Sequence, residues 1–517
     1  MTLTLLQTPT QAADWLRSRV TGDLQGDSRR VRSGDGFLAW PGRRHDARED
    51  LAGVFAQGAS ACVVEHHGLS ARTQEAAARH QVASYEQLKS ASGWIADAFY
   101  GHPSRNLPVI AVTGTNGKTS ITWWLSHVLS TLQKPCMAVG TLGLGQVQSS
   151  PEASQLSLRD EAGHEGLTTP DAIGLHRQLR RWLDQGVQAC AMEASSIGLA
   201  EQRLAGLKVH TAVFSNLTPD HLDYHGNLEV YGQAKASLFD APGLKVAVIA
   251  VDQAFGQELA HRIKTQRPEV DLWTVSAQSF GDAKAAARVQ LRSLQVRAHD
   301  AHQHLVFESD GQTHDMLTPL MGRFNVDNLL LVWAVLMAWG QSSKPALEAL
   351  QALRPVPGRM QRLGGSGKPH VVVDYAHTPD AVNKVLTEVN RLAALSTGRV
   401  ITVLGCGGDR DASKRPLMAQ EAQQLSHRFW LTSDNPRSED PEAIARDMLA
   451  GLNDQQGLTI ELQRDKAIAQ AIAQATAKDW VVIAGKGHEA YQEVQGVRHP
   501  FSDERHAQAA LNQWRAA

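Results

Sequence analysis

The sequence has little cysteine and no long apolar stretch. Its 517 residues include four cysteines, which lie far apart and form no Cys-x-x-Cys pair. This spacing argues against a disulfide framework and a zinc site, and it favours reduced thiols in the cytosol. No apolar run reaches about 18 residues, and the N-terminus has neither a basic start nor a long apolar core. We therefore expect a cytoplasmic protein with no membrane insertion.

An excess of charge of either sign is also absent. The 51 Lys and Arg residues nearly balance the 53 Asp and Glu residues, so the formal net charge is -2. Without a basic footprint, the sequence gives no reason to expect nucleic acid as a partner. A hydrophobic content of 42% and a charged content of 20% are ordinary for a globular enzyme. The length exceeds what one core supports and predicts about three domains.

Residues 109–125 hold the most informative motif, an apolar run followed by a glycine-containing loop and a segment with helical spacing. A strand, a glycine loop and a helix start direct backbone N–H groups and the helix dipole at one spot, where a polyphosphate binds. In this loop Lys118 adds a positive charge, and the hydroxyl of Thr119 is placed to ligate Mg²⁺. The general P-loop pattern requires a glycine where this chain has Val112, so the loop is a shorter form. We predict ATP binding here, with a purely structural turn as the alternative.

The periodicity predicts three domains of the α/β class. Residues 1–105 form a small α/β domain, with short apolar runs at 36–40 and 61–65. In residues 106–353 strands and helices alternate, which predicts a mostly parallel sheet. Residues 354–517 follow a Pro-Val-Pro-Gly boundary and form a third domain of alternating strands and helices.

Residue ranges can be predicted for individual strands of the second and third domains. Residues 290–319 differ from their surroundings, because their alternation suggests antiparallel strands joined at Asp310-Gly311. The other predicted strands span residues 137–139, 189–192, 211–215, 246–251, 371–374, 400–405, 428–432 and 481–484.

Three side chains of the second domain carry chemistry. Ligands of parallel sheets gather beyond the carboxyl ends of the strands, which selects Glu193 and residues 216–225. A carboxylate such as Glu193 and an imidazole such as His221 can hold a divalent ion beside nucleotide phosphates. Lys235 lies nearby in the sequence. Taken singly, each of these residues could instead be an ordinary polar side chain, and Lys235 a solvated helix lysine.

Several motifs together resemble the MurE branch of the Mur ligase family, in the family's order and over nearly the whole chain. The motifs are residues 114–119, 168–170, 192–196, 216–226, 324–328, 374–379, 405–411, 434–437 and 485–489. The resemblance implies an N-terminal UDP-binding domain, a central P-loop ATPase-like domain and a C-terminal Rossmann-like domain. It implies ATP-dependent addition of meso-diaminopimelate to UDP-N-acetylmuramoyl-L-alanyl-D-glutamate through an acyl phosphate, in peptidoglycan precursor synthesis.

The resemblance also implies the site residues. Catalysis is expected from Lys118, Lys235, His221 and Glu193. ATP is expected at Gly114, Thr115, Asn116, Gly117, Lys118, Thr119, Ser120, Asn325, Asn328, Arg359 and Asp374. The UDP-muramoyl peptide is expected at Ser28, Arg43, Arg44, His45, Thr168, Thr169, Ser195 and Arg203. Diaminopimelate is expected at Arg410, Asp434, Asn435, Pro436, Arg437, Gly485 and Glu489. Mg²⁺ is expected at Thr119, Glu193, His221 and Lys235, the lysine carrying a carbamate derived from CO₂.

The identity of the added amine depends on Arg437, whose guanidinium can pair with the distal carboxylate of meso-diaminopimelate through two hydrogen bonds. Lysine lacks that carboxylate, so an L-lysine-adding enzyme is the alternative. A folylpolyglutamate synthetase-like ligase and a non-catalytic MurE-like scaffold are weaker alternatives. Ile197 and Glu201 depart from the family pattern and put individual substrate contacts in question, as do Ala250 and Gln253. We expect a monomer.

Overall fold

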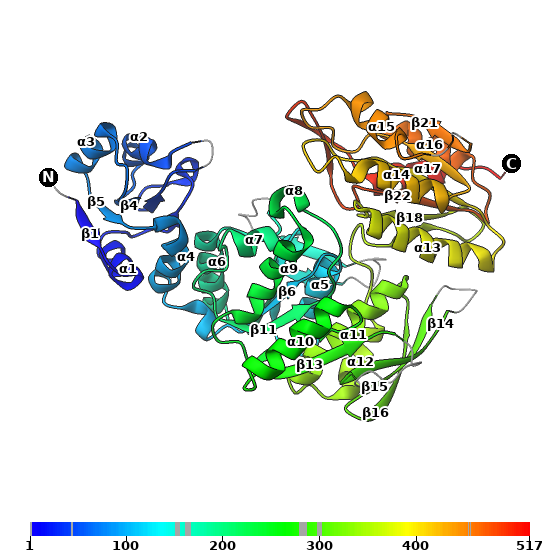
Figure 1. The fold of residues 1–517 in the computed structure, drawn as a ribbon, viewed down its shortest axis with the longest axis horizontal. Helices are drawn as coiled ribbons and strands as arrows, with labels where there is room; N and C mark the ends of the chain where they lie inside the picture. The colour runs from blue at the N-terminus through cyan, green and yellow to red at the C-terminus, as the bar shows by residue number, and fades with distance from the viewer. Residues whose placement is uncertain are drawn as a thin grey trace.

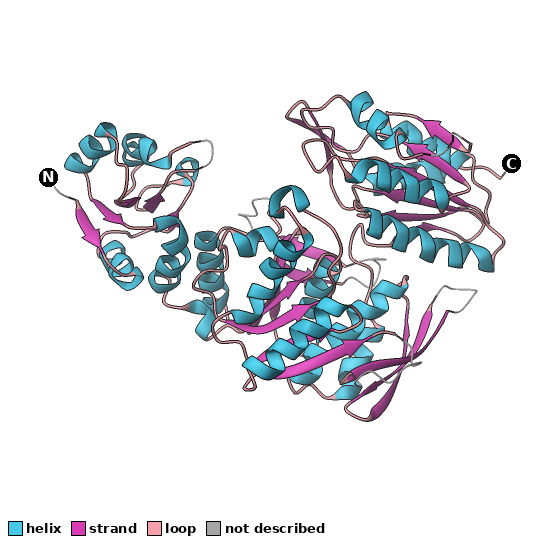
Figure 2. Cartoon of the chain, viewed as in Figure 1, coloured by secondary structure: helices cyan, strands magenta, loops and turns pink. Residues whose placement is uncertain are grey.

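The computed structural model describes residues 3–42, 45–149, 156–160, 167–278, 287–296, 302–452, 454 and 456–516, with only the backbone of residues 159 and 160. These residues form three α/β lobes that follow one another along the chain (Figure 1). In each lobe helices pack against the strands of a sheet (Figure 2).

The described N-terminal lobe contains a five-stranded parallel sheet in the order β1-β5-β4-β3-β2. Its strands are β1 (Thr4–Leu6), β2 (Leu24–Gln25), β3 (Gly36–Ala39), β4 (Ala61–Glu65) and β5 (Val82–Tyr85). Its helices are α1 (Pro9–Arg17), α2 (Leu51–Ala56), α3 (Ala71–Arg79) and α4 (Leu88–Phe99). The apolar runs predicted at 36–40 and 61–65 are therefore strands, as expected.

The described part of the central lobe has eleven strands, in the order β16-β15-β14-β13-β12-β11-β6-β10-β7-β8-β9. They are β6 (Val109–Thr113), β7 (Cys136–Gly140), β8 (Gly143–Gln148), β9 (Ser157–Asp160), β10 (Ala189–Glu193), β11 (Val209–Phe214), β12 (Val246–Ala250), β13 (Asp271–Ser276), β14 (Val289–Val296), β15 (Gln303–Ser309) and β16 (Gln312–Thr318). The strands from β14 to β7 run parallel, as predicted.

Both ends of this central sheet are antiparallel. β15 and β16 form the hairpin predicted at Asp310-Gly311, and both turn residues have the positive φ that such a turn requires. β8 and β9 form a second antiparallel extension, which the sequence pattern did not predict. The central sheet is therefore mixed, although its middle, where β6 lies, is parallel.

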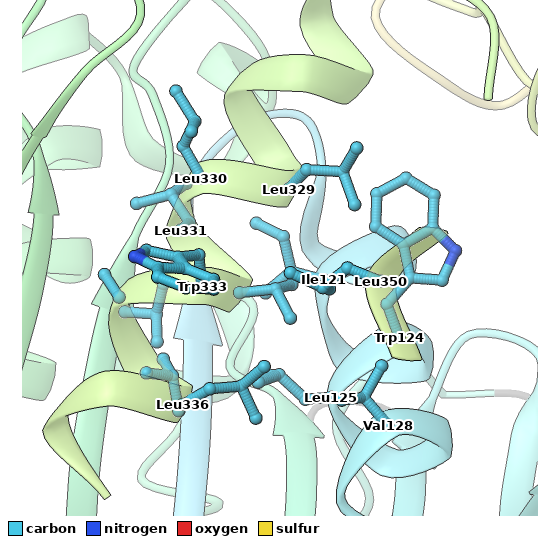
Figure 3. Close-up of a cluster of buried hydrophobic side chains, with 14 of the residues drawn as sticks. Ile121, Trp124, Leu125, Val128, Leu329, Leu330, Leu331, Trp333, Leu336 and Leu350 are labelled. Atoms are coloured by element: carbon cyan, nitrogen blue, oxygen red, sulfur yellow. The ribbon is translucent and has the colours of Figure 1, made fainter. Parts of the chain in front are cut away.

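The described residues of the central lobe form two buried hydrophobic clusters, one between the sheet and helices α5 and α11 and the other between the sheet and helices α6 and α10. The helices of this lobe are α5 (Lys118–Thr131), α6 (Ala172–Asp184), α7 (Ser196–Ala200), α8 (Leu222–His225), α9 (Leu228–Ala236), α10 (Ala254–Gln266), α11 (Arg323–Ala338) and α12 (Ser343–Gln351). Figure 3 shows α5 side chains such as Ile121 and Leu125 packed against α11 side chains such as Leu329 and Trp333. This packing fixes α5, whose first turn follows the glycine-containing loop after β6; this loop is called the phosphate loop below.

The described C-terminal lobe has a six-stranded sheet in the order β17-β18-β22-β19-β20-β21, parallel except for β17, and a separate hairpin of β23 and β24. Its strands are β17 (Gln361–Gly364), β18 (His370–Asp374), β19 (Val400–Leu404), β20 (Arg428–Leu431), β21 (Leu458–Ile460), β22 (Trp480–Ala484), β23 (Tyr491–Val494) and β24 (Val497–Pro500). Its helices are α13 (Pro379–Leu395), α14 (Lys414–Gln424), α15 (Pro441–Leu449), α16 (Arg464–Ala473) and α17 (Asp503–Gln513).

A buried ion pair lies beneath two loops of the C-terminal lobe. Arg464 and Asp503 are both 0% exposed, and Arg464 Nε lies 2.7 Å from Asp503 Oδ1. The same guanidinium donates to the carbonyl oxygens of Ser433 and Ala484 at 3.3 and 2.9 Å. The pair therefore supports the backbone at the ends of β20 and β22.

Replacing Asp503 with alanine should destabilise this lobe by about 3–5 kcal/mol, because it leaves the Arg464 charge buried and uncompensated. Urea denaturation followed by tryptophan fluorescence measures the loss. Arg446→Ala is the control, because that side chain is 65% exposed and makes only long surface pairs. The control should change stability by less than about 0.5 kcal/mol. Equal stability of the two variants would contradict the assigned role.

Candidate active site

The phosphate loop connects β6 to α5 and lies at the centre of the parallel strands. Gly117 precedes the helix with φ of 90°, and a Cβ there would lie 2.3 Å from Asn328 Oδ1, so only glycine fits between the loop and α11. Among the described residues, no side chain caps the start of α5. Its first N–H groups, beginning at Lys118, are thus available to an anion, and the helix dipole favours one. The chain has Val112 where the general P-loop pattern has a glycine. Val112 lies within the buried strand β6.

Two lysine side chains converge on this loop. The Nζ atom of Lys118 donates to the carbonyl oxygens of Gly114 and Thr115 at 2.9 and 2.8 Å. The Nζ atom of Lys235, from α9, donates to the same Gly114 oxygen at 2.8 Å and lies 4.1 Å from the centre of the Tyr231 ring. Burial, followed by the charge of Lys118, lowers the pKa of Lys235 well below that of a free lysine. The environment therefore favours a neutral amine at Lys235.

Glu193 lies beside the loop because β10 pairs with β6, with Glu193 opposite Val112. Its carboxylate accepts hydrogen bonds from the backbone N–H and the hydroxyl of Thr141, at 2.8 and 3.2 Å. A Cβ at Gly140 would lie 2.1 Å from this carboxylate, so a glycine is required there. The side chain is 1% exposed yet lines the cleft described below. A carboxylate fixed in this way can contribute to a cation site.

His221 follows β11 in a loop and has a positive φ of 54°. Its backbone N–H donates to Asp220 Oδ1 at 2.9 Å. Burial lowers the pKa of its imidazole; Asp220 opposes this effect, and Lys118 and Lys235 reinforce it. The ring is thus favoured in its neutral form, which is the form that ligates metals.

The C-terminal lobe and the segment before it also reach the phosphate loop. Arg359 Nη2 donates to the hydroxyl of Thr119 at 3.1 Å, and its guanidinium stacks on Tyr375. Asp380 Oδ2, at the start of α13, accepts from Asn116 Nδ2 at 3.1 Å and from the Thr218 hydroxyl at 3.3 Å. The phosphate loop and the start of α5, both in the central lobe, therefore contact the C-terminal lobe and the segment before it.

The residues predicted to bind the nucleotide also include two asparagines and an aspartate. Asn325 donates to the carbonyl oxygen of Met321 at 2.6 Å, and Asn328 lies against Gly117. Asp374 accepts a hydrogen bond from the Met360 N–H at 2.7 Å. Burial raises the pKa of Asp374 to about 6, although Arg359 opposes the shift.

The loop after β20 holds Arg437 in an unusual backbone conformation. Its φ is 54°, a left-handed value uncommon outside glycine, and neighbouring backbone holds it there. The Arg437 N–H donates to the carbonyl oxygen of Glu493, and the Arg437 carbonyl accepts from the Gln495 N–H. Its Nη1 donates to the carbonyl oxygen of Gly408 at 2.6 Å. The hairpin of β23 and β24 therefore fixes where this guanidinium lies.

Next to Arg437, the carboxylates of Asp434 and Glu489 lie close together. Asn435 Nδ2 donates to Glu489 Oε2 at 2.6 Å, and Lys486 Nζ lies 3.1 Å from the same oxygen. Burial, followed by the charge of Asp434, raises the pKa of Glu489, while Lys486 opposes the shift. Of the other predicted residues, Arg410 and Gly485 line the cleft. Pro436 is not among the lining residues, and its carbonyl oxygen accepts from the Glu439 N–H within the loop.

The residues predicted for the UDP-muramoyl peptide divide into two groups. In the N-terminal lobe, Ser28 donates to Asp50 at 2.7 Å, and His45 Nε2 lies 2.9 Å from the same carboxylate. Arg43 and Arg44 lie outside the described residues. Arg30 is the residue of this lobe that lines the cleft among the described positions.

The central-lobe group surrounds Glu193. Thr168, Ser195 and Arg203 line the cleft. Thr169 is fully buried, and its hydroxyl donates to the Glu193 carbonyl at 2.9 Å and accepts from the Ser195 N–H at 3.0 Å. The Thr169 side chain thus supports the loop and does not face the cleft. Glu201, an exception to the family pattern, accepts from Lys89 of α4 at 2.6 Å and from Tyr224 at 2.7 Å.

One cleft of about 1430 Å³ brings most of these groups together. Its walls include the phosphate loop, Glu193, His221 and Lys235 on the central lobe, and Asp374, Arg410, Arg437 and Glu489 on the C-terminal lobe. Sequence reasoning assigned no role to Asp380, which directly follows the motif 374–379, or to Lys486, which lies within the motif 485–489. Asp380 contacts residues distant in sequence, and Lys486 contacts Asn435 as well as the nearby Glu489, so only their position at these motifs could have indicated them.

The described residues offer no cluster of three or more His, Cys, Asp or Glu side chains that could hold a metal ion alone. Within the same residues, no helix is long and apolar enough to cross a membrane.

A glycine loop after a strand in the parallel middle of a mixed sheet, facing a second α/β lobe across a shared cleft, is typical of a nucleotide-dependent enzyme with a P-loop-like site. Residues 112–336 match the Mur ligase middle domain, and residues 358–487 match the domain described as "Mur ligase, glutamate ligase domain". The chain is 46% identical to UDP-N-acetylmuramoyl-L-alanyl-D-glutamate--2,6-diaminopimelate ligase of Acidovorax sp. (strain JS42), over 99% of this chain and 98% of that protein. It is 42% identical to the ligase of the same name from Pseudomonas aeruginosa, with 96% of each chain covered. The chain therefore belongs to the Mur ligase family, in its MurE branch.

Solved structures agree with this placement. A structure of UDP-N-acetylmuramoyl-L-alanyl-D-glutamate--2,6-diaminopimelate ligase is 34% identical with a TM-score of 0.64, covering 95% of this chain and 94% of that one. Mycobacterium tuberculosis folylpolyglutamate synthase shares the fold at 18% identity and a TM-score of 0.58, covering 77% of this chain and 92% of that one.

Proposed function

We propose that this protein is the ATP-dependent ligase that adds meso-diaminopimelate to UDP-N-acetylmuramoyl-L-alanyl-D-glutamate, in the cytoplasmic synthesis of peptidoglycan precursors. The observation that carries the proposal is the shared cleft, in which the phosphate loop faces the loop that holds Arg437. One site can therefore receive a triphosphate, an acid and an amine with a distal carboxylate. We further propose that the enzyme acts as a monomer, with domains at residues 1–105, 106–353 and 354–517.

The reaction begins at the phosphate loop. A free carboxylate is a poor acyl donor, so the γ-phosphate of ATP is transferred to the D-glutamyl γ-carboxylate, leaving ADP and an acyl phosphate. Lys118 and the first N–H groups of α5 stabilise the charge that develops on the transferred phosphate. Asn325, Asn328, Arg359 and Asp374 orient the nucleotide.

The second step takes place where the two lobes face each other. The amine of the diamino acid attacks the acyl carbon, and loss of phosphate and a proton gives the peptide bond. Arg437 and Glu489 orient the amine from the C-terminal lobe, while Thr168, Ser195 and Arg203 hold the muramoyl peptide. Ser28, Arg43, Arg44 and His45 bind its UDP group. No protein nucleophile is required.

The residues present fit a divalent cation and a carbamate. The buried amines of Lys235 and Lys118 share one carbonyl oxygen, which disfavours a charge on both. A neutral Lys235 amine can react with CO₂, and the resulting carbamate would supply a second anionic group beside the Glu193 carboxylate and the neutral His221. Mg²⁺ held by these groups, and a second ion near Thr119, would neutralise phosphate charge.

A substrate panel tests the proposal. Purified protein should release ADP and phosphate only when ATP, Mg²⁺, the UDP-muramoyl dipeptide and meso-diaminopimelate are all present. Replacing diaminopimelate with L-lysine should lower kcat/KM at least about 100-fold, because the Arg437 fork would be left unpaired. Equal turnover with L-lysine would contradict the assigned amine. Turnover of folate with glutamate would contradict the whole proposal, and absence of any turnover would favour a non-catalytic scaffold.

A further inference from the structure

Lys486 lies in the loop after β22, and its side chain is 0% exposed. Its Nζ atom lies 2.9 Å from Asn435 Oδ1, 3.1 Å from Glu489 Oε2 and 3.7 Å from Asp434 Oδ1. A buried ammonium group is costly unless it is paired and hydrogen-bonded, and these three side chains supply that pairing. Lys486 is not among the residues that line the cleft, whereas all three of its partners are.

The contacts of Lys486 determine the orientation of the Asn435 amide. An ammonium group has donors only, so it can face the amide oxygen but not the amide nitrogen. The same Oδ1 atom accepts from the Glu493 N–H at 2.9 Å, which leaves Nδ2 to donate to Glu489 at 2.6 Å. Lys486 thus fixes Glu489 directly and also through Asn435.

Lys486 also sets the charge of this wall of the cleft. Asp434 and Glu489 are two carboxylates in a largely buried place, and together they would repel each other. One ammonium group beneath them offsets part of that repulsion, and both carboxylates belong to a wall that also carries Arg410 and Arg437. The carboxylates of Asp434 and Glu489 are complementary to an ammonium group of a diamino acid.

We propose that Lys486 is a positioning residue for the amino-acid substrate, acting through Glu489 and Asn435 without touching the substrate. Because the buried ammonium group holds both side chains, Glu489 is presented to the substrate in one orientation and as a carboxylate. This inference rests on the proposed function, since it assigns a role in binding the diamino acid.

The test is steady-state kinetics of the full chain with Lys486→Met, varying each substrate in turn. The KM for meso-diaminopimelate should rise about 10- to 100-fold, the range expected when a charged hydrogen-bonding support is lost. The KM values for ATP and the UDP-muramoyl dipeptide should stay within about twofold. Lys368→Met is the matched control, because the ammonium group of Lys368, a lysine of the same lobe, donates to the Leu511 carbonyl, and it should leave all three KM values unchanged.

An unchanged KM for diaminopimelate, or an equal rise in all three KM values, would overturn the inference. If Lys486→Met does not fold, Lys486→Gln removes the charge but keeps a donor, and it should show a smaller rise in the same KM.

A double-mutant cycle adds an independent readout: in a Glu489→Gln background, removing Lys486 should change the KM for meso-diaminopimelate by less than about threefold. A full multiplicative effect would overturn action through Glu489. Failure of the unaltered protein to use meso-diaminopimelate would instead overturn the proposed function.

Discussion

Replacing Lys235 with alanine is expected to lower the rate of ligation at least about 1000-fold, because the proposed carbamate, and with it an anionic ligand of the proposed cation site, would be lost. Lys235 is 1% exposed, and its Nζ atom donates to the phosphate loop. Another positively charged side chain at position 235 is therefore not expected to replace it. Lys235→Arg, which keeps a positive charge but cannot form a carbamate, should be as inactive as the alanine variant. Short carboxylates added to Lys235→Ala should restore part of the activity.

The same model predicts how pH and CO₂ affect the unaltered protein. Carbamate formation requires the neutral amine, and burial lowers the pKa of Lys235, so the reactive form persists at lower pH than for a free lysine. Activity should fall as the pH drops through that lowered pKa, and added bicarbonate should oppose the fall. Lys264→Ala, on the exposed side of α10, is the control and should retain full activity. Full activity of Lys235→Ala would exclude the carbamate.

Replacing Arg437 with lysine should lower kcat/KM for meso-diaminopimelate about 100-fold. The planar guanidinium can bind a carboxylate through two parallel hydrogen bonds, which an ammonium group cannot reproduce. The loss should be specific for the amine: KM for ATP should remain unchanged, and the low activity with L-lysine should change by less than about threefold. Kinetics with the two amines measure the difference.

The control for Arg437 is Arg446→Ala, which removes an exposed arginine of the same lobe. Its kcat/KM for both amines should equal that of the unaltered protein. A parallel loss with meso-diaminopimelate and L-lysine in the Arg437 variant would mean that Arg437 holds the loop together and does not read the distal carboxylate. The Arg437 guanidinium also donates to the carbonyl oxygen of Gly408, and the comparison of the two amines separates this loop contact from recognition of the distal carboxylate.

Much of the fold could be predicted because its strands are short apolar runs with polar ends. The run at 61–65 coincides with β4, and the Asp310-Gly311 pair forms the predicted turn. Strand β8 was missed because its sequence, Gly-Leu-Gly-Gln-Val-Gln, contains few apolar residues and forms a strand through pairing with β7. Such strands depend on tertiary context more than on local preference.

The candidate site was predictable only in part, for a related reason. Glu193 could be placed because it directly ends a predicted strand, and parallel strands bring their ends together. The contact between Asn116 and Asp380 joins residues 264 positions apart, and it depends on how two lobes dock. No local pattern encodes such docking. The prediction that Thr169 binds the UDP-muramoyl peptide stays a prediction, and its motif did not indicate that the hydroxyl bonds to the Glu193 carbonyl.

The guanidinium of Arg464 donates to the backbone of two loops, at Ser433 and Ala484, that lie beside the proposed amine site, so these loops have a common foundation. A shift of either loop would disturb its hydrogen bond to this one side chain. Under the proposed function, we therefore expect a change of the added amine to come from the side chains of these loops rather than from their backbone.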